Sequence, residues 1–288
     1  MKPIGRTLRV AVAGAFLAVL SQPALSAEEA APIERQKWSF SGIFGQFDKA
    51  QLQRGYQVYS EVCGNCHELK RIYFRNLAQK GGPEFPEEGV KALAASVQVE
   101  DGPNDEGKMY ERPGKLSDPL PRRYKNEQEA RTIHNGAYPP DLSLMARARN
   151  VEYHGSVWFH PLSMLRDVVT GYQEGGADYI YALLTGYKDP PPDVKLVEGM
   201  NYNQAFPGHQ IAMPNPLAAG DGQVAYQDGT KPTVDNYARD VAAFLSWTAD
   251  PKLDERKQLG WQVIGYLLVT TILLYIAKKR IWSRIAQH

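Results

Sequence analysis

The residues with the most recognisable chemistry lie together in one short stretch, Cys63-Gly64-Asn65-Cys66-His67. Two thiols at this spacing can add to the two vinyl groups of a haem, and the imidazole that follows then lies beneath the iron as an axial ligand. The chain contains no other cysteine, so thioether formation would consume both thiols. The sequence therefore predicts one covalently bound haem c, held by Cys63, Cys66 and His67.

Two other kinds of site use cysteines at a similar spacing. A redox-active Cys-x-x-Cys pair of the thioredoxin type lies in a βαβ context, and the surrounding sequence has no such alternation of strands and helices. A zinc site needs further ligands, and the chain has no second Cys/His pair at ligand spacing. Haem attachment is therefore the better interpretation.

The second axial ligand decides what such a haem could do. A closed site with histidine and methionine ligands transfers electrons, whereas an open iron can bind small ligands. The candidates are the remaining histidines and five methionines, which are Met109, Met145, Met164, Met200 and Met213. We favour Met213, because prolines on both sides of it in the 207–216 segment fix the backbone. Met200 and the nearby His209 remain alternatives.

Both ends of the chain carry apolar segments. Residues 1–26 begin with basic residues, continue into an apolar run and close on small residues, which is typical of a secretory signal peptide. Residues 260–277 contain no charge, have aromatic residues near both ends, and precede a basic cluster. This pattern predicts a transmembrane helix at 259–278 and a cytoplasmic tail at 279–288. Residues 27–258 would then form an exported domain in an oxidising compartment.

The exported part has the pattern of a few helices separated by long loops. Helical periodicity and capping signals predict helices at 48–62, 127–134, 142–149, 178–184 and 234–247. Glycines and prolines are frequent in 81–121 and 188–231, which we expect to be mostly loop. Short helices of this kind make a poor core by themselves, so a haem is expected to fill the centre.

Several sequence blocks resemble the cytochrome c1 family, the haem subunit of the bc1 complex. The blocks occur in the same order over most of the chain. They are W-x-F-x-G-x-F-G at 38–45, R-G-x-x-V-Y at 54–59, N-G-A-Y-P-P-D-L-S at 135–143, R-A-R at 147–149, D-Y-I at 178–180, L-L-T-G-Y at 183–187, N-Y-N at 201–203 and F-L-S-W at 244–247.

The resemblance implies an all-α, class I cytochrome c-like domain with long loop insertions, followed by one C-terminal transmembrane helix. It implies that Met213 is the second axial ligand beside His67, and that Arg149 binds a haem propionate. It also implies a haem wall of mostly apolar residues, namely Pro139, Pro140, Met145, Tyr179, Leu183, Leu184 and Ile211.

The chain departs from the family pattern in three respects. His134 and His209 stand where Asn and Gly are expected, which affects the polarity at the haem edge. Residues 151–175 form an insertion relative to shorter members. No cysteine pair is left to brace a loop, as occurs in some bacterial relatives.

The resemblance further implies a role in electron transfer. The chain would take an electron from the Rieske iron–sulfur protein and pass it to a soluble or anchored cytochrome c. The enzyme would be the whole quinol–cytochrome c oxidoreductase, which also contains cytochrome b, in a bacterial inner membrane with the haem domain in the periplasm. Alternatives are a free-standing, membrane-anchored cytochrome c and a haem enzyme such as a peroxidase. No nucleic-acid partner is expected.

Charge is distributed unevenly in the exported part. Residues 28–259 hold 26 Lys and Arg against 32 Asp and Glu, a net charge of −6, although the whole chain has a net charge of +1. Residues 84–111 hold eight acids against two lysines, also a net charge of −6. We expect this acidic segment to attract a basic acceptor protein, with a merely solvated loop as the alternative.

Overall fold

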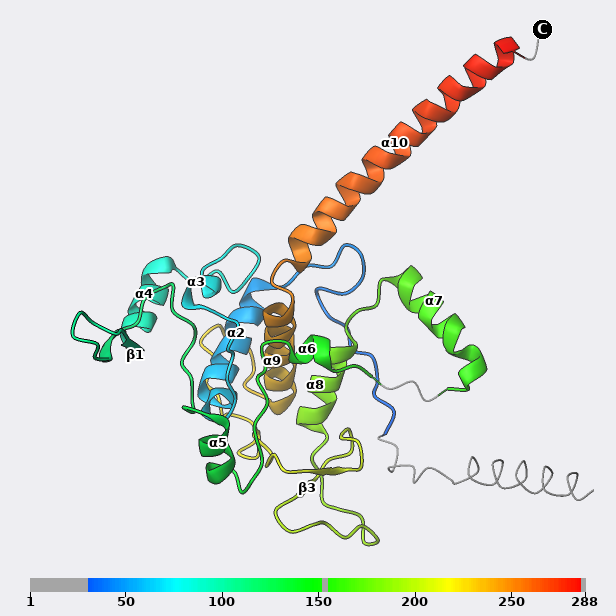
Figure 1. Cartoon of the computed structure of the whole chain (residues 1–288). Coiled ribbons are helices and arrows are strands. Elements are labelled where there is room, and N and C mark those ends of the chain that lie inside the picture. Colours follow the sequence, from blue (N-terminus) through cyan, green and yellow to red (C-terminus); the bar gives the residue numbers. More distant parts are fainter. Residues whose placement is uncertain (1–30, 152–154, 286–288) are drawn as a thin grey trace, which may run out of the picture.

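The computed structural model describes residues 31–151 and 155–285. This part of the chain is mostly helical, and a single long helix, α10 (Leu253–Ile285), projects from a domain of helices and loops (Figure 1). The expected all-α class is confirmed, with two small two-stranded ladders added to it. The predicted signal peptide at 1–26 lies outside the described residues.

Two helices that the sequence predicts, α2 (Lys49–Glu61) and α9 (Val234–Ala249), form the centre of the domain. Each begins at a side-chain cap. The Asp48 carboxylate accepts a hydrogen bond from the backbone N of Gln51 (2.8 Å), and the Thr233 hydroxyl accepts one from the backbone N of Asn236 (3.3 Å). Pro251 directly follows Asp250, the C-cap residue of α9. A proline disfavours helical geometry in the residue before it, so the helix ends here.

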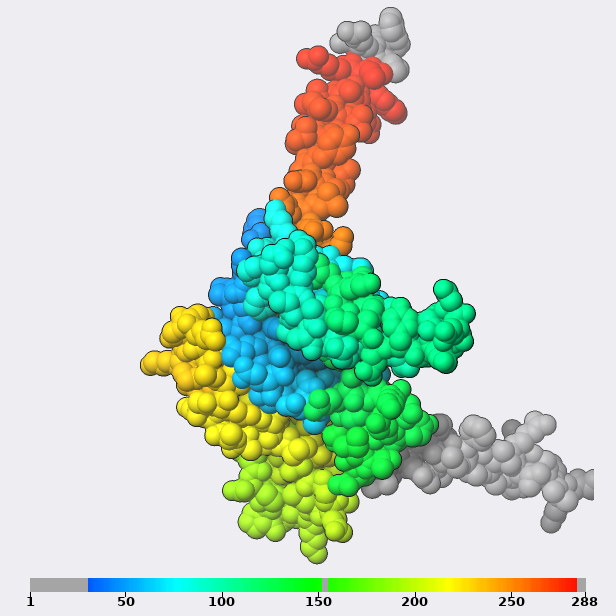
Figure 2. Space-filling view, turned by 90° about the vertical axis from the view of Figure 1, so that its left-hand side faces the viewer, coloured from blue at the N-terminus to red at the C-terminus, as the bar shows by residue number. Residues whose placement is uncertain are grey.

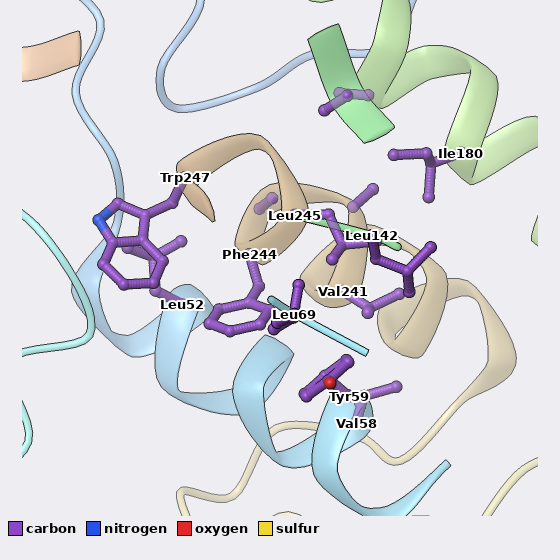
Figure 3. Close-up of a cluster of buried hydrophobic side chains, with 14 of the residues drawn as sticks. Leu52, Val58, Tyr59, Leu69, Leu142, Ile180, Val241, Phe244, Leu245 and Trp247 are labelled. Atoms are coloured by element: carbon purple, nitrogen blue, oxygen red, sulfur yellow. The ribbon is translucent and has the colours of Figure 1, made fainter. Parts of the chain in front are cut away.

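The crossing of α2 and α9 requires a glycine. A Cβ atom at Gly55 would lie 2.6 Å from the Cβ of Phe244 and would also overlap the carbonyl oxygen of Asp240. Leu52 lies beside this crossing in the buried cluster that contains Phe244 (Figure 3). The Arg54 guanidinium adds an ion pair to the buried Asp240 carboxylate, with 2.7 Å between Nε and Oδ2. Close backbone approach and a charge pair therefore both hold α2 on α9.

Two further helices complete the scaffold. The helix α8 (Gly175–Thr185) packs on α9, and the short α6 (Met145–Ala148) packs on both. The buried Asp178 carboxylate in α8 accepts hydrogen bonds from the indole Nε1 of Trp38 (2.7 Å) and from the hydroxyl of Tyr172 (2.6 Å). This carboxylate ties the N-terminal segment to α8.

The 81–121 region contains more regular structure than predicted. It contains α4 (Glu87–Ala95) and an antiparallel hairpin of β1 (Gln98–Asp101) and β2 (Tyr110–Pro113), next to the short α3 (Phe74–Leu77). Val90 and Ala94 lie one helical turn apart on one face of α4, and both are buried. Arg112 on β2 pairs with Asp101 and with Asp118, the latter at 2.7 Å. After the hairpin, α5 (Glu127–Ile133) lies where the sequence predicts a helix.

The 188–231 region is mostly loop, as predicted. Within it, β3 (Asn201–Tyr202) pairs antiparallel with β4 (Gln210–Ile211), and we refer to residues 201–213 as the strap. The side chain of Asn203 is fully buried, and its Nδ2 donates to the carbonyl oxygen of Leu183 at the end of α8 (2.8 Å). The backbone N of Asn203 donates to the carbonyl oxygen of His209 (2.9 Å). One residue, Asn203, therefore joins both sides of the strap to α8 through its side-chain amide and its backbone N–H.

The insertion at 151–175 contains helical structure that the sequence analysis did not predict. A 3₁₀ turn, η2 (Val157–Phe159), leads into α7 (His160–Thr170), which has a proline in its first turn and ends at Gly171 with φ of +67°. No residue of η2 or α7 is buried.

In the described part of the chain, one helix is long and apolar enough to cross a membrane, over Leu253–Ser283. This helix, α10, begins before the predicted span at 259–278. Its first turns belong to the domain, because Leu253 is buried and the Lys257 Nζ donates to the carbonyl oxygen of Phe40 (2.6 Å). The apolar residues beyond them are exposed, as expected of a membrane anchor.

The Gly55 contact yields a stability prediction. Gly55→Ala should lower the free energy of unfolding by about 1–3 kcal/mol, because the new methyl group must push α2 and α9 apart. The matched control is Gly89→Ala in α4, where a Cβ would meet nothing within 4 Å. The control should gain up to about 1 kcal/mol from helix propensity. Denaturant unfolding followed by circular dichroism measures both, and a stabilised Gly55→Ala would contradict the assigned crossing.

Candidate haem site

The Cys63 to His67 stretch follows α2 directly. After α2 the chain makes a 3₁₀ turn, η1 (Cys63–Asn65), and the backbone N of His67 donates to the carbonyl oxygen of Cys63 (2.8 Å). The hydroxyl of Tyr59, one of the buried residues of α2, donates to the carbonyl oxygen of His67 (3.1 Å). The helix and the turn together fix the backbone that carries both thiols and the imidazole.

The two thiols are available for thioether bonds. Cys63 and Cys66 are unpaired, and burial, with a smaller contribution from Cys66, raises the pKa of the Cys63 thiol. A redox-active pair needs the opposite, a lowered thiol pKa. In the described part of the chain, no three His, Cys, Asp or Glu side chains cluster as a metal site would require. The raised pKa of Cys63 disfavours a redox-active pair of the thioredoxin type.

The imidazole of His67 is oriented by a single hydrogen bond. Its Nδ1 lies 2.8 Å from the carbonyl oxygen of Pro140, and a carbonyl can only accept, so Nδ1 must carry the proton. The other ring nitrogen, Nε2, then keeps a free lone pair. Burial also lowers the pKa of His67, which keeps the ring neutral. A neutral imidazole with its Nδ1–H held by a backbone carbonyl is the form that binds a metal through Nε2.

The residue after the histidine is anchored as well. The buried carboxylate of Glu68 accepts hydrogen bonds from the backbone N of Arg123 (2.8 Å) and Tyr124 (3.1 Å), and it pairs with Lys70 (3.0 Å). Burial alone would raise the pKa of Glu68, but these donors outweigh it, so its pKa lies below the ordinary value. The backbone N of Leu142 donates to the carbonyl oxygen of Glu68 (2.9 Å). The segment that carries Pro140 is therefore held against the end of the haem motif.

Two side chains hold the backbone of Met213, the last residue of the strap. The hydroxyl of Tyr187 donates to the carbonyl oxygen of Met213 (3.0 Å), and the side-chain amide of Asn201 approaches the same oxygen at 3.4 Å. Tyr187 follows α8 directly, so the position of Met213 is set by the scaffold rather than by the loop alone. The side chain of Met213 is half-buried.

The other candidate methionines lie in different surroundings. Met109 stands before β2 in the hairpin, Met164 lies on α7, and Met200 directly precedes β3, and all three side chains are exposed. Met145 is half-buried at the start of α6. Of the two methionines favoured from the sequence, Met213 is therefore the better sheltered.

The predicted haem-wall residues divide by burial. Tyr179, Leu184 and Ile211 are buried. Pro139, Met145 and Leu183 are half-buried, and Pro140 is exposed although its carbonyl oxygen meets His67. These residues come from the loop before α6, from α6, from α8 and from β4. Of these residues, Pro140 contacts His67 directly through its carbonyl oxygen, and the contact of the others with a haem stays a prediction.

The structure places Arg149 at the C-terminal end of α6, exposed. It lines a cleft of about 850 Å³ between the domain and α7, together with Arg35, Arg147 and Arg166. Arg147 forms an ion pair with Asp250, whereas Arg149 has no ion-pair partner among the described residues. Its guanidinium is thus free for an acidic group, and its contact with a haem propionate stays a prediction.

The two unexpected histidines lie in turns with unusual backbone geometry. His209 has a φ of +56°, a conformation that glycine adopts without strain, which accounts for the expectation of Gly at this position. Its ring is buried beside Tyr202. The Nε2 of His134 lies 2.5 Å from the hydroxyl of Tyr124, next to Asn135 with φ of +51°. Both imidazoles therefore have protein partners.

Three supporting residues had no role in the sequence-based prediction. They are Glu68 and Asn203, which anchor the two ends of the site, and Tyr187, which holds the Met213 carbonyl. Asn203 and Tyr187 fall within family-like blocks, and that was the only signal for them. The burial of a polar side chain depends on the folded loop around it, and no periodicity encodes it.

Comparisons with known proteins identify the family of this chain. A model of the Cytochrome C1 family matches residues 38–285. The cytochrome c1 of Blastochloris viridis is 49% identical over 268 residues, covering 92% of each chain. A mitochondrial cytochrome c1 haem protein of Solanum tuberosum is 42% identical over 246 residues, 85% of this chain and 84% of that protein.

A longer relative also matches. The cytochrome b/c1 of Bradyrhizobium diazoefficiens is 46% identical over 277 residues, which are 96% of this chain but only 39% of that protein. Covalent haem c is characteristic of the matched family, and the local geometry at 63–67 fits it. With its haem motif, its fold and these relatives in agreement, the chain belongs to the cytochrome c1 family.

Proposed function

We propose that this chain is the haem-bearing electron-transfer subunit of a bc1 complex. The observation that carries the proposal is the imidazole of His67, whose Nδ1 is held by the Pro140 carbonyl so that Nε2 is free for iron. When bound, the haem supplies a one-electron redox centre. The chain's own residues attach it, orient it and shield it, and none of them performs bond chemistry on a substrate.

Each element of the site has a definite part in this proposal. Cys63 and Cys66 would attach the haem through thioethers, and His67 and Met213 would each supply one ligand to its iron. A thioether favours the reduced iron and raises the potential, which suits an acceptor of electrons from a quinol-oxidising complex. Arg149 would neutralise a propionate with its guanidinium.

The proposed partners follow from the family. The donor would be the Rieske iron–sulfur protein and the acceptor a soluble or anchored cytochrome c, with cytochrome b as the membrane partner. The name of the Bradyrhizobium relative joins cytochrome b to c1, which supports the last of these. The catalytic entity would be the quinol–cytochrome c oxidoreductase as a whole.

The proposed topology places the haem domain, residues 27–258, in the periplasm. A signal peptide at 1–26 would be removed, the 259–278 span would cross the inner membrane, and 279–288 would remain in the cytoplasm. The basic cluster after the span supports this orientation.

Gentle detergent extraction followed by affinity purification tests complex membership. We expect cytochrome b and an iron–sulfur protein to accompany this chain at fixed stoichiometry, with quinol–cytochrome c reductase activity in the same fraction. A haem chain that purifies alone from membranes containing those proteins would instead support the free-standing cytochrome. Carbon monoxide binding to the reduced haem would indicate an open iron and a haem enzyme.

The axial ligand is tested by a pair of substitutions. Met213→Lys should lower the reduction potential by on the order of hundreds of millivolts, because an amine replaces the thioether. Met200→Lys is the matched control, since Met200 precedes β3 with its side chain exposed. Redox titration of the visible spectrum measures both. A large drop in Met200→Lys together with an unchanged Met213→Lys would reverse the assignment.

The acidic segment at 84–111 remains the proposed docking surface for the acceptor. Several of its acids are neutralised locally: Glu87 and Glu88 pair with Lys91, and Asp101 pairs with Arg112. Glu100, Asp105 and Glu111 are exposed and have no ion-pair partner among the described residues. They lie on the hairpin and its turn, which project from the domain surface (Figure 2).

Ionic strength tests this surface. Exposed charges are screened over a Debye length of ~10 Å at 0.1 M salt, so electron transfer to a basic cytochrome c should slow steeply as salt rises. Replacing Glu100, Asp105 and Glu111 with their amides should flatten that dependence. The control neutralises Asp189, Asp193 and Glu198, three exposed acids of the loop before the strap. Equal flattening in both variants would show that net charge, rather than the hairpin, guides the encounter.

A further inference from the structure

The helix α7 exposes a continuous apolar face. Trp158 in η2 and Leu162, Leu165 and Val169 in α7 recur at helical spacing, so they share one face. Their exposed fractions are 87%, 63%, 58% and 74%. Several exposed apolar side chains on one face of a helix mark a place where a partner or a membrane binds.

The helix α7 leaves its apolar face uncovered by the rest of the described chain. An 11-residue helix is marginal in water by itself, and most helices gain their stability by burying an apolar face. The helix buries none of its residues, and the cleft of about 850 Å³ lies between it and the domain. Its polar side is held by an ion pair between Asp167 and Arg35 (2.8 Å). Among the described residues, Ser163 and Asp167 line this cleft, whereas Leu162, Leu165 and Val169 do not, so the apolar face is turned away from the domain.

The C-terminal end of α7 adjoins the base of the long apolar helix. Gly171 lies against Ile43, whose Cγ2 would be 3.2 Å from a Cβ at that glycine. The next residue, Phe44, stacks on Trp261 of α10, with 4.7 Å between the ring centroids and 4° between the planes. Ile43, Phe44 and Trp261 are themselves exposed. In Figure 1, the end of α7 reaches the height at which α10 leaves the domain.

We propose that α7 lies in the membrane interface, with its apolar face among the acyl chains and its Ser163 and Asp167 side towards the domain. Aromatic residues such as Trp158 and Phe159 favour the interfacial region, and amphipathic helices bind there parallel to the bilayer. The inference rests on the proposed membrane insertion of α10. It assigns to the 151–175 insertion a second, non-spanning attachment to the lipid surface.

Lipid fits this face better than a protein partner does. The four residues of the face carry no charge, and among them only the indole N–H of Trp158 can form a hydrogen bond that would orient a partner. The face is also continuous, through Ile43 and Phe44, with the residues at which α10 begins its apolar run. A lipid surface covers such a face without requiring shape complementarity.

Spin labelling of the full haem-containing chain tests the proposal. Because both native cysteines form thioethers, a cysteine introduced by Leu165→Cys would be the only free thiol. The chain is placed in phosphatidylcholine and phosphatidylglycerol nanodiscs, and collision with oxygen is compared with collision with a water-soluble nickel complex. Ser163→Cys labels the opposite side of α7, and Leu268→Cys labels the middle of α10.

We expect the oxygen-to-nickel collision ratio at Leu165→Cys to exceed that at Ser163→Cys several-fold and to approach that at Leu268→Cys. A lipid signal at Leu268→Cys with a water signal at Leu165→Cys would overturn the inference and leave the anchor intact. Water signals at both would overturn the membrane assignment of α10 as well. If Leu165→Cys is in water in the isolated chain and shielded from both reagents only in the assembled complex, a protein covers α7 and the lipid proposal fails.

Discussion

The hydrogen bond between the Nδ1 of His67 and the carbonyl oxygen of Pro140 is the contact on which the rest of the site depends. It fixes the tautomer, and hence which nitrogen can reach iron, and it fixes the plane of the ring. It can form only if the 139–142 segment lies against the end of α2. The backbone hydrogen bond from Leu142 to Glu68 holds the segment in this position. The Glu68 carboxylate, which accepts from the backbone N of Arg123, fixes Glu68 itself.

The strap, which carries Met213, is held in a different way. The strap belongs to the mostly irregular 188–231 region and contains only two short strands, so it gains order chiefly from a few fixed points. The buried amide of Asn203 attaches it to the end of α8, and Tyr187 holds the Met213 carbonyl. Both anchors lead to α8, since Leu183 lies in it and Tyr187 follows its C-cap. The helix α8 packs on α9, which in turn packs on α2. The same helical scaffold therefore positions the backbone of both proposed ligands, His67 and Met213.

The sequence predicts the parts of this protein whose information is local. The 63–67 motif specifies its chemistry within five residues, and α2 and α9 follow from caps and apolar periodicity. The hairpin and α4 were expected to be mostly loop, because glycines and prolines are frequent in 81–121. Their order involves contacts that form only in the fold, such as the packing of Val90 in the core and the pairing of Arg112 with Asp118. The helix α7 was not predicted, although its apolar residues recur at helical spacing in the sequence. Asn203 and Tyr187 act through contacts that only the folded strap creates.

X-ray absorption fine structure at the iron edge of the purified full chain tests whether the iron has one nitrogen ligand from His67 and one sulfur ligand from Met213. We expect one sulfur neighbour alongside the haem and imidazole nitrogens, and we expect its loss in Met213→His while the covalent haem remains. An iron surrounded by nitrogen or oxygen alone in the unaltered chain, or a sulfur neighbour that persists in Met213→His, would contradict this ligand assignment.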